Sequence, residues 1–574
     1  MKFLLVGINA KYIHSNPAIY SLAACAGEGR ADTETAEYTI NHQVEQVVAD
    51  IFRRQPDVIG FSCYIWNMNF IRAVVERLHW LMPQVPMWFG GPEVSFETEA
   101  FLMECPEAFG VMVGEGERTY ARVLEQYRTQ NTSEEALAQI PGLVFRRTDG
   151  TFCATGQPEL PELSDIPFLY SDLSGFENRI LYYETSRGCP FRCSYCLSSA
   201  DSPVRLRSLD LVLPELQFFL DQKVPQVKFV DRTFNCNHRH CQTIWRYLQE
   251  HDNGVTNFHF EISADLLNET EMEILSQFRP GQIQLEIGIQ TTNDDALMTI
   301  HRTAPYEKIA ERTERIRKER RIHQHLDLIA GLPYEDYDSF GRSYDAVYAL
   351  RPDQLQLGFL KLLKGSELYR RAEEYGLVYS HRPPYEILST PELPFARLLA
   401  LKEIEEVTEL YYNSGQFRQT LEELMRDARP FVRMEHLAVY FHEKDLFEKQ
   451  HNRLAKYTIL WDFLQQEITD GERLQTLRHL LTIDWYQREL TKVRPVFADP
   501  AGIPEKEEKR RFYQREAKQH RWLAVGYDEE DSRLLANVTH LEKLDAENAL
   551  LFDYRNRDFF YGNAKILRVR LSGE

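Results

Sequence analysis

Three closely spaced cysteines constrain this chain more than any other feature of its sequence. Cys189, Cys193 and Cys196 stand in RGCPFRCSYC, which directly follows a strand-like run, ILYYETS, at residues 180–186. Thiolates are soft ligands that suit iron, and this spacing lets all three reach a single cluster. Three ligands leave one iron of a four-iron cluster without a protein thiolate. The alternatives are a zinc site, which needs a fourth protein ligand when structural, or unrelated buried cysteines.

Length and charge narrow the class of protein further. The chain has 574 residues, 43% hydrophobic and 27% charged, which is a globular composition for about three or four domains. A net charge of -20 disfavours sequence-independent binding to nucleic-acid phosphates. No stretch has the pattern of a membrane helix or a signal peptide, and an odd count of nine cysteines does not make a disulfide framework. We therefore expect a cytoplasmic protein without a membrane segment.

Residues 1–130 are expected to form an α/β domain with a doubly wound, Rossmann-like sheet. Short apolar runs at residues 3–7, 58–63, 87–90 and 110–113 have the pattern of buried parallel strands. Amphipathic stretches between them fit helices, the first with Ser15 or Asn16 as its N-cap. In such sheets ligands bind beyond the carboxyl ends of the strands. The loops found there are NAKYIHSNP, YIWN, GGPEV and GEGE.

The rest of the chain falls into three further stretches. Residues 131–175 are punctuated by prolines and are predicted to be an extended linker. In residues 176–380 six strand-like runs alternate with helical ones, which predicts a partial (β/α)6 barrel of the TIM-like kind. Residues 381–574 are expected to form a mostly helical domain, with an aromatic-rich end whose pattern is compatible with strands.

The cysteine motif and the strands after it resemble the radical S-adenosylmethionine (SAM) superfamily, whose CxxxCxxC loop follows the first strand of a partial barrel. The resemblance covers about residues 179–379. It implies that Cys189, Cys193 and Cys196 hold a 4Fe–4S cluster whose remaining iron binds SAM. An electron from the cluster then cleaves SAM to methionine and a 5′-deoxyadenosyl radical, so a reductant such as flavodoxin or ferredoxin is implied as a partner.

The same resemblance implies five SAM contacts. Tyr195 precedes the last cysteine, at the position whose aromatic ring usually lies over the adenine. The segments FVDRTFN, FEISAD and LEIGIQTTN resemble the strand ends that hold the cofactor, and they contain Asp231, Glu261, Glu286 and Gln290. Polar groups at strand carboxyl ends point into a barrel mouth. Each of these residues, taken alone, also fits a structural turn or a salt bridge.

Placed before such a barrel, the N-terminal domain resembles the cobalamin-binding domain of cobalamin-dependent radical enzymes. The residues that carry this resemblance are the Gly90-Gly91-Pro92 turn and residues 113–117, where glycines let the backbone approach a large ligand. The alternative is that these glycines only make strand-to-helix turns. The cobalamin contacts implied are Asn9, Ser62, Tyr64, Ile65, Trp66, Gly90, Gly91, Pro92, Glu115, Gly116 and Glu117.

One departure from the cobalamin pattern concerns the loop NAKYIHSNP. Domains that bind cobalt through a histidine carry Asp-x-His-x-x-Gly at this position, and this loop does not match it. His14 is therefore expected to be a cap or packing residue. The resemblance then implies that bulky side chains of YIWN line the lower face of the cobalt.

A second group of metal-binding residue types lies in NCNHRHC. A helix that starts near residue 237 places His238 and Cys241 on one face, but Cys236 and His240 need not join them. We therefore favour ordinary surface and core roles for the four residues and leave metal binding open.

Together these resemblances imply an enzyme, a cobalamin-dependent radical SAM methyltransferase. In the implied reaction a methyl group passes from SAM through methylcobalamin to an unactivated carbon, after the 5′-deoxyadenosyl radical has removed a hydrogen. The alternatives are a non-methylating rearrangement, cyclisation or oxygenation, and a non-catalytic cobalamin or redox sensor. The expected substrate is a small molecule or a peptide, and nucleic acid is not favoured. The sequence identifies neither the substrate nor the catalytic residues.

Overall fold

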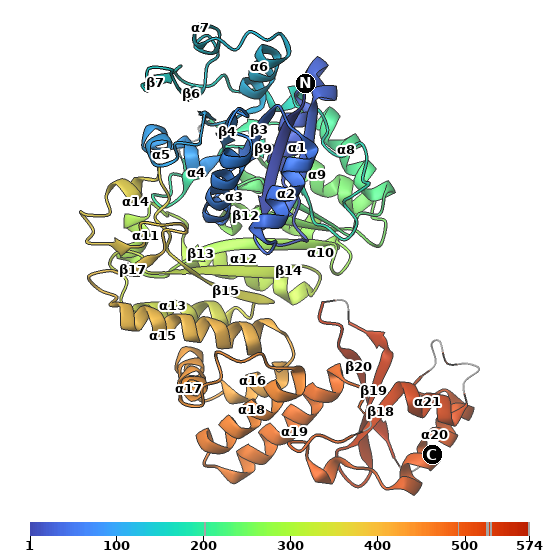
Figure 1. Ribbon diagram of the computed structural model, residues 1–574. Coiled ribbons are helices and arrows are strands. Elements are labelled where there is room, and N and C mark those ends of the chain that lie inside the picture. Colours follow the sequence, from blue (N-terminus) through green and yellow to red (C-terminus); the bar gives the residue numbers. More distant parts are fainter. Residues whose placement is uncertain (200–202, 492, 524–526, 528–530, 559, 572–574) are drawn as a thin grey trace. The chain divides into compact units, whose positions relative to one another are not determined.

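The computed structural model describes residues 1–199, 203–491, 493–523, 527, 531–558 and 560–571 (Figure 1). The chain divides into two compact units. The first comprises residues 1–324, 329–336 and 358–395, and the second comprises residues 325–328, 337–357 and 396–574. Among the described residues no helix is long and apolar enough to cross a membrane.

The first unit begins with a seven-stranded sheet in the order β2-β1-β3-β4-β5-β6-β7. Strands β1 to β5 are parallel, whereas β6 and β7 run antiparallel at one edge. Their bounds are β1 (Phe3–Asn9), β2 (Thr33–Thr39), β3 (Val58–Ser62), β4 (Met87–Gly90), β5 (Gly110–Met112), β6 (Leu143–Arg146) and β7 (Phe152–Ala154). The central strands are buried along their whole length because helices cover both faces, which explains their continuous apolar runs. The predicted doubly wound fold is confirmed.

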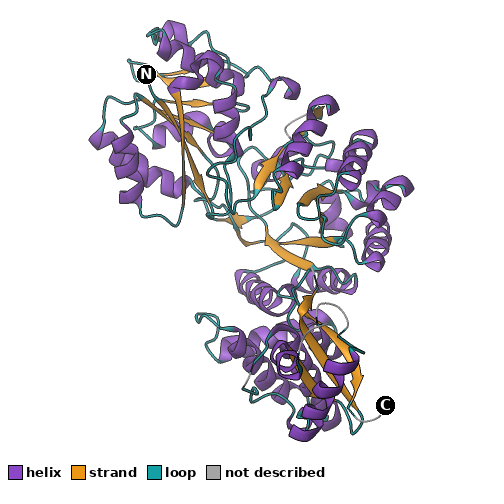
Figure 2. Ribbon diagram, turned by 90° about the vertical axis from the view of Figure 1, so that its right-hand side faces the viewer, coloured by secondary structure: helices purple, strands orange, loops and turns teal. Residues whose placement is uncertain are grey.

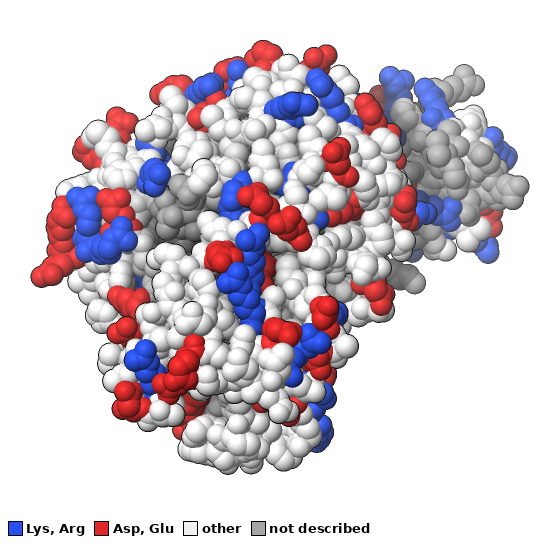
Figure 3. Space-filling model, turned by 90° about the horizontal axis from the view of Figure 1, so that it is seen from above, with Lys and Arg blue, Asp and Glu red and all other residues white. Residues whose placement is uncertain are grey.

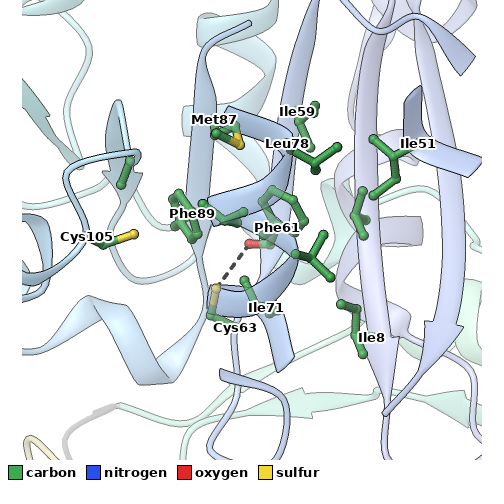
Figure 4. Close-up of a cluster of buried hydrophobic side chains, with 14 of the residues drawn as sticks. Ile8, Ile51, Ile59, Phe61, Cys63, Ile71, Leu78, Met87, Phe89 and Cys105 are labelled. Carbon is green, nitrogen blue, oxygen red and sulfur yellow. Dashed lines mark hydrogen bonds between the residues drawn. The ribbon is translucent and has the colours of Figure 1, made fainter. Parts of the chain in front are cut away.

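Helices on the two faces of this sheet create two hydrophobic cores. They are α1 (Pro17–Ala24), α2 (Val44–Arg54), α3 (Met68–Leu81), α4 (Pro92–Ser95), α5 (Thr98–Glu104) and α6 (Glu117–Arg128). Figure 4 shows the first core, in which strand residues such as Phe61 and Phe89 lie beside Ile71 and Leu78 of α3. The N-cap of α1 is Asn16, whose side chain accepts a hydrogen bond from the Ile19 N–H at 3.4 Å. These helices hold the strand ends, and the loops after them, in fixed positions.

The structure differs from the sequence prediction at β2 and at residues 131–175. The predicted linker contains α7 (Glu134–Leu137) and the β6–β7 hairpin, whose Phe145 and Cys153 enter the second core. Asp149-Gly150 between two short alternating runs is a hairpin signal, which the prolines further along obscured. Strand β2 was missed because its sequence, TETAEYT, has only two apolar side chains.

A second sheet of six strands follows, in the order β15-β14-β13-β12-β11-β8. The strands are β8 (Leu181–Tyr183), β11 (Gln226–Phe229), β12 (Asn257–Ile262), β13 (Ile283–Gln290), β14 (His323–Ala330) and β15 (Gln354–Phe359). Strands β8, β11, β12 and β13 pair in parallel. The helices between strands are α8 (Leu209–Asp221), α9 (His238–Glu250), α10 (Glu269–Gln277), α12 (Tyr306–Glu319) and α13 (Tyr337–Ala349), an alternation visible in Figures 1 and 2. This is the alternation of strands and helices that the sequence predicts for a partial barrel.

The C-terminal region is mostly helical, as predicted. Its helices are α15 (Phe395–Val407), α16 (Arg418–Leu424), α17 (Pro430–Glu443), α18 (Arg453–Glu467), α19 (Gly471–Arg488), α20 (Lys506–Gln519) and α21 (Ser532–Val538). The aromatic-rich end forms an antiparallel sheet of β18 (Thr539–Lys543), β19 (Asn548–Arg557) and β20 (Ala564–Arg570).

On the face of the molecule seen in Figure 3, Lys and Arg side chains are interspersed with Asp and Glu.

Candidate cofactor-binding site

The three motif cysteines lie on one loop that follows β8. The short strands β9 (Ser186–Arg187) and β10 (Arg205–Leu206) flank this loop. Cys193 is buried, Cys189 and Cys196 are half-buried, and none of them is in a disulfide. Burial raises the pKa of the Cys193 thiol, Arg302 lowers it, and Cys196 and Cys189 raise it, so both of these thiols lie within electrostatic range of Cys193. Three thiols on one short loop fit the ligands of an iron–sulfur cluster, and this assignment stays a prediction.

The other cysteine and histidine group lies on and just before α9. Within the described ranges no group of three or more His, Cys, Asp and Glu side chains is arranged to hold a single metal ion. The His238 Nδ1 atom lies 2.8 Å from the Glu271 carboxylate, and His240 and Cys241 are buried on α9. The surface and core roles favoured from the sequence are consistent with this arrangement.

Asp231 fixes the strand that leads into the cysteine loop. Its fully buried carboxylate accepts hydrogen bonds from the N–H and hydroxyl of Thr185, at 2.9 and 2.6 Å, and from the Ser186 hydroxyl at 2.7 Å. Burial raises the pKa of Asp231 to about 6, and these hydrogen bonds oppose the shift. The sequence predicts Asp231 as a SAM contact, which stays a prediction; in the structure its carboxylate contacts Thr185 and Ser186 and so positions the strand before the cysteines.

Arg302 lies against the cysteine loop and was not predicted. Its guanidinium donates a hydrogen bond to the Gly288 carbonyl of β13 and also hydrogen-bonds the Cys193 thiol. Tyr195, the predicted adenine contact, is within electrostatic range of the same guanidinium. A lone arginine after α11 (Asp294–Thr299) has no local sequence signal, so only the fold brings it to this loop. Hydrogen bonds to cluster ligands influence reduction potential, which makes Arg302 a candidate functional residue.

Charged side chains occupy the inner face of the barrel strands. The Glu286 carboxylate lies 3.0 Å from the Lys228 ammonium and 2.9 Å from His259 Nε2. On the neighbouring strand the Glu261 carboxylate lies 4.0 Å from the same ammonium. The side-chain carbonyl of Gln290, at the end of β13, is buried and has no hydrogen-bond partner among the described residues. An unsatisfied buried acceptor of this kind fits a site where a polar ligand such as SAM binds.

The Glu261 carboxyl leads to a prediction about pH. Burial and the neighbouring Glu286 carboxylate raise the pKa of Glu261 from 4.5 to about 7. A carboxyl whose pKa is raised on folding adds stability below its unfolded pKa, and that stability is lost as the pH rises through its folded pKa. The full shift corresponds to about 3 kcal/mol, and the 29% exposure of the side chain reduces the effect. We therefore expect wild type to lose about 1–2 kcal/mol more than Glu261→Gln between about pH 5 and about pH 8.

The measurement is the denaturant midpoint of both proteins at the two pH values. The comparison with Glu261→Gln cancels the contribution of the other carboxyl groups, which titrate in both proteins. Parallel pH profiles for the two proteins would show that Glu261 titrates as an ordinary surface carboxyl.

A cavity of about 900 Å³ lies at the carboxyl ends of β1, β3, β4 and β5. Every residue that the sequence assigns to cobalamin lines it, and Tyr182, Arg187 and Cys196 line it from the barrel side. Tyr64 and Trp66 stack with ring centroids 4.3 Å apart and make an aromatic part of the wall. The size is near the upper end of the range for ligand cavities, which fits a large cofactor such as cobalamin.

Gly91 shows how closely the backbone approaches its neighbours at this cavity. Its φ of 108° is one that side chains rarely permit, and a Cβ built there would lie 2.5 Å from the Cys63 carbonyl oxygen. We expect Gly91→Ala to cost about 1–3 kcal/mol of stability and to reduce the cobalamin that the protein retains. The measurement is cobalamin per chain after reconstitution and gel filtration.

Gly150 provides the matched control for Gly91. It also has a positive φ, of 84°, but a Cβ there meets no atom within 4 Å. Gly150→Ala should therefore show a smaller stability loss and normal cobalamin content. Equal cobalamin retention in the two variants would contradict a role for the Gly91 turn.

Glu115 and Glu117 form ion pairs with arginines of the barrel region. The Arg187 guanidinium lies 2.6 Å from Glu115, 3.0 Å from Glu117 and 2.7 Å from Glu184, and Arg205 also pairs with Glu115. These two glutamates and Arg187 are at most 17% exposed. The network joins the loop after β5 to the strand that precedes the cysteines. The two carboxylates therefore position the loops, in addition to lining the cavity.

Three family models match this chain. Residues 4–124 match the B12 binding domain, residues 183–347 match the Radical SAM superfamily, and residues 373–557 match a protein family of unknown function, DUF4080. The chain thus contains a region that matches the B12 binding domain, followed by a region that matches the Radical SAM superfamily. The predicted cofactors, a 4Fe–4S cluster, SAM and cobalamin, are those of the two matched families.

Curated relatives and solved structures agree with this assignment. The cobalamin-dependent radical SAM methyltransferase TokK of Streptomyces tokunonensis is 25% identical over 357 residues, which are 57% of this chain and 51% of TokK. The 2-(S-pantetheinyl)-carbapenam-3-carboxylate methyltransferase of Streptantibioticus cattleyicolor is 27% identical over 325 residues, which are 52% of this chain and 45% of that enzyme. The chain thus spans about half the length of these relatives.

The solved structures show the shared fold. The radical SAM methyltransferase TsrM of Kitasatospora setae, with cobalamin and a [4Fe-4S] cluster bound, superposes with a TM-score of 0.57 at 16% identity, covering 77% of this chain and 99% of TsrM. The cobalamin-dependent radical enzyme OxsB, with aqua-cobalamin and SAM bound, superposes with a TM-score of 0.56 at 14% identity, covering 84% of this chain and 78% of OxsB.

Proposed function

We propose that the chain is a cobalamin-dependent radical SAM methyltransferase that acts on an unactivated carbon of a small molecule or peptide. The observation that carries the proposal is the shared cavity. The Gly90-Gly91-Pro92 turn and residues 114–117 line one part of it, and Cys196 of the cysteine motif lines another. A substrate in this space would be adjacent to both cofactor loops, and such proximity can supply a large part of a rate enhancement.

The residues of the chain position and enclose the reacting groups. When bound, the cluster, SAM and cobalamin would supply reductive cleavage of SAM and carriage of a methyl group. Asp231 holds Thr185 and Ser186, so that the strand before the cysteines has a fixed direction. Arg302 interacts with the Cys193 thiol of the loop itself. The Tyr64–Trp66 stack forms an aromatic part of the cavity wall.

Anaerobic reconstitution tests this proposal. The protein is loaded with iron, sulfide and cobalamin, and then given SAM with a labelled methyl group and flavodoxin or ferredoxin as the electron donor we propose. We expect reductive cleavage of SAM to give 5′-deoxyadenosine, and transfer of the labelled methyl group from SAM to cobalamin to give S-adenosylhomocysteine. Chromatography with mass spectrometry measures both products.

The two products separate the alternatives. 5′-Deoxyadenosine without S-adenosylhomocysteine or labelled cobalamin would indicate radical chemistry that does not methylate. Absence of 5′-deoxyadenosine from a fully loaded protein would overturn the enzymatic proposal and favour a cobalamin or redox sensor.

A further inference from the structure

The carboxylates that line the cavity all have partners from the chain. They are Glu93, Glu115, Glu117, Glu184 and Glu215. Tyr385 donates a hydrogen bond to Glu93, and Arg187 pairs with the next three. The Arg207 Nε–H donates a 3.0 Å hydrogen bond to Glu215. Each of these carboxylates therefore has at least one hydrogen-bond or ion-pair partner from the chain.

The cationic side chains that line the same cavity have partners from the chain, with one exception. Arg187 and Arg207 pair with the carboxylates just described, and the Lys364 ammonium lies 3.8 Å from Glu97. His14 lies 2.6 Å from the Tyr182 hydroxyl, and burial lowers its pKa, so it is neutral at pH 7. Of the charged residues that line the described cavity, Arg232 is the one whose guanidinium makes neither an ion pair nor a hydrogen bond.

Arg232 lies between the two predicted cofactor sites. It follows β11 and the buried Asp231, and both it and Val230 line the cavity. Its charge acts on the Tyr64 phenol from the cobalamin-side loop and on the Glu261 carboxyl of the barrel, but neither is an ion-pair partner. The residue itself is exposed.

A guanidinium that lines a cavity and has no ion-pair partner among the described residues is suited to bind an anionic ligand. Its planar donors match a carboxylate or phosphate with two parallel hydrogen bonds. We propose that Arg232 binds a carboxylate or phosphate group of the substrate, which makes an anionic molecule the substrate class. This inference rests on the proposed function, because that function places a substrate in the cavity.

Both cofactors also carry such groups, since SAM has a carboxylate and cobalamin has a phosphate. The test therefore uses protein loaded with cluster, SAM and cobalamin, with inorganic phosphate as the probe anion. Phenylglyoxal modifies accessible arginines, and peptide mass spectrometry measures the rate at each arginine. Arg239 is the internal control, because it is exposed on α9 and does not line the cavity.

We expect Arg232 to react in the loaded protein. Phosphate at about ten times its dissociation constant should slow that reaction about tenfold, because only unoccupied sites react, and should leave Arg239 unchanged. The variants Arg232→Gln and Arg239→Gln, which remove the same charge, should bind equal amounts of iron, cobalamin and SAM. Lower SAM or cobalamin binding in Arg232→Gln alone would assign the guanidinium to that cofactor and overturn the proposal.

Two results in the modification assay would also overturn the proposal. One is an Arg232 rate that phosphate does not change. The other is an Arg232 that reacts only when SAM or cobalamin is omitted, since the cofactor's own anion would then occupy it. Cofactor content is measured first on the same sample. A protein that fails to load therefore counts against the proposed function, whereas a loaded protein without phosphate protection counts against the anion site.

Discussion

Replacing Cys193 with alanine is expected to reduce the iron bound after reconstitution to near zero and to abolish formation of 5′-deoxyadenosine. The variant removes one of three predicted cluster ligands and the thiol that Arg302 contacts. Cobalamin content should be unchanged, because Cys193 does not line the cavity. Iron and sulfide analysis, visible absorption and cobalamin content measure the three outcomes on one sample.

Cys236 offers a matched control for this variant. It is half-buried and, like Cys193, lies within electrostatic range of Cys189, but it stands outside the CxxxCxxC motif. We expect Cys236→Ala to bind iron like wild type. Full iron content in Cys193→Ala, or the same loss in both variants, would contradict the assignment of the cluster ligands.

Replacing Arg187 with methionine is expected to destabilise the first unit by about 3–5 kcal/mol, because the change leaves buried carboxylates without a counter-charge. Glu117 is the most sensitive of them. Burial would raise its pKa, but Arg187 holds the pKa of Glu117 below its usual value. We also expect weaker cobalamin retention, since Glu115 and Glu117 line the cavity. Denaturant midpoints and cobalamin content after gel filtration measure the two effects.

The chain itself supplies a control and a rescue for this prediction. Arg205→Met removes one partner of Glu115 and leaves Arg187 in place, so its loss should be smaller. The double variant Arg187→Met/Glu117→Gln should recover part of the loss, because it removes the orphaned charge. If the effects of the two substitutions on the free energy of unfolding are additive, Arg187 and Glu117 are not energetically coupled. That result would contradict a role of the network in positioning the loops.

The location of the site could be predicted from the sequence because its markers are local. Each marker loop directly follows an apolar strand, and the carboxyl ends of parallel strands share one edge of a sheet. Tyr64, Gly91 and Glu117 are far apart in the chain, yet they were expected together, and one cavity contains them. The helical C-terminal region was also expected from its pattern.

The partners of individual polar side chains could not be predicted in the same way. Asp231 and Glu286 carry the right chemistry for a ligand, but Asp231 contacts Thr185 and Ser186, and Glu286 contacts Lys228. Each contact is made to a different strand, and its geometry depends on register. Which carboxylates stay available to SAM is therefore decided by tertiary structure, as is the approach of Arg302 to the cysteine loop.

The β6–β7 hairpin determines where the N-terminal B12-binding domain could be separated from the rest of the chain. The family match ends at residue 124, and the sequence suggests a limit near residue 130, but β6 pairs with β5 from Leu143 to Phe145. A fragment cut at either limit would leave β5 as an open sheet edge, which invites aggregation. A fragment that continues through Thr155, whose N–H donates to the Leu143 carbonyl at 2.9 Å, keeps that edge closed. Cobalamin titrations on the isolated N-terminal domain should therefore use the longer fragment.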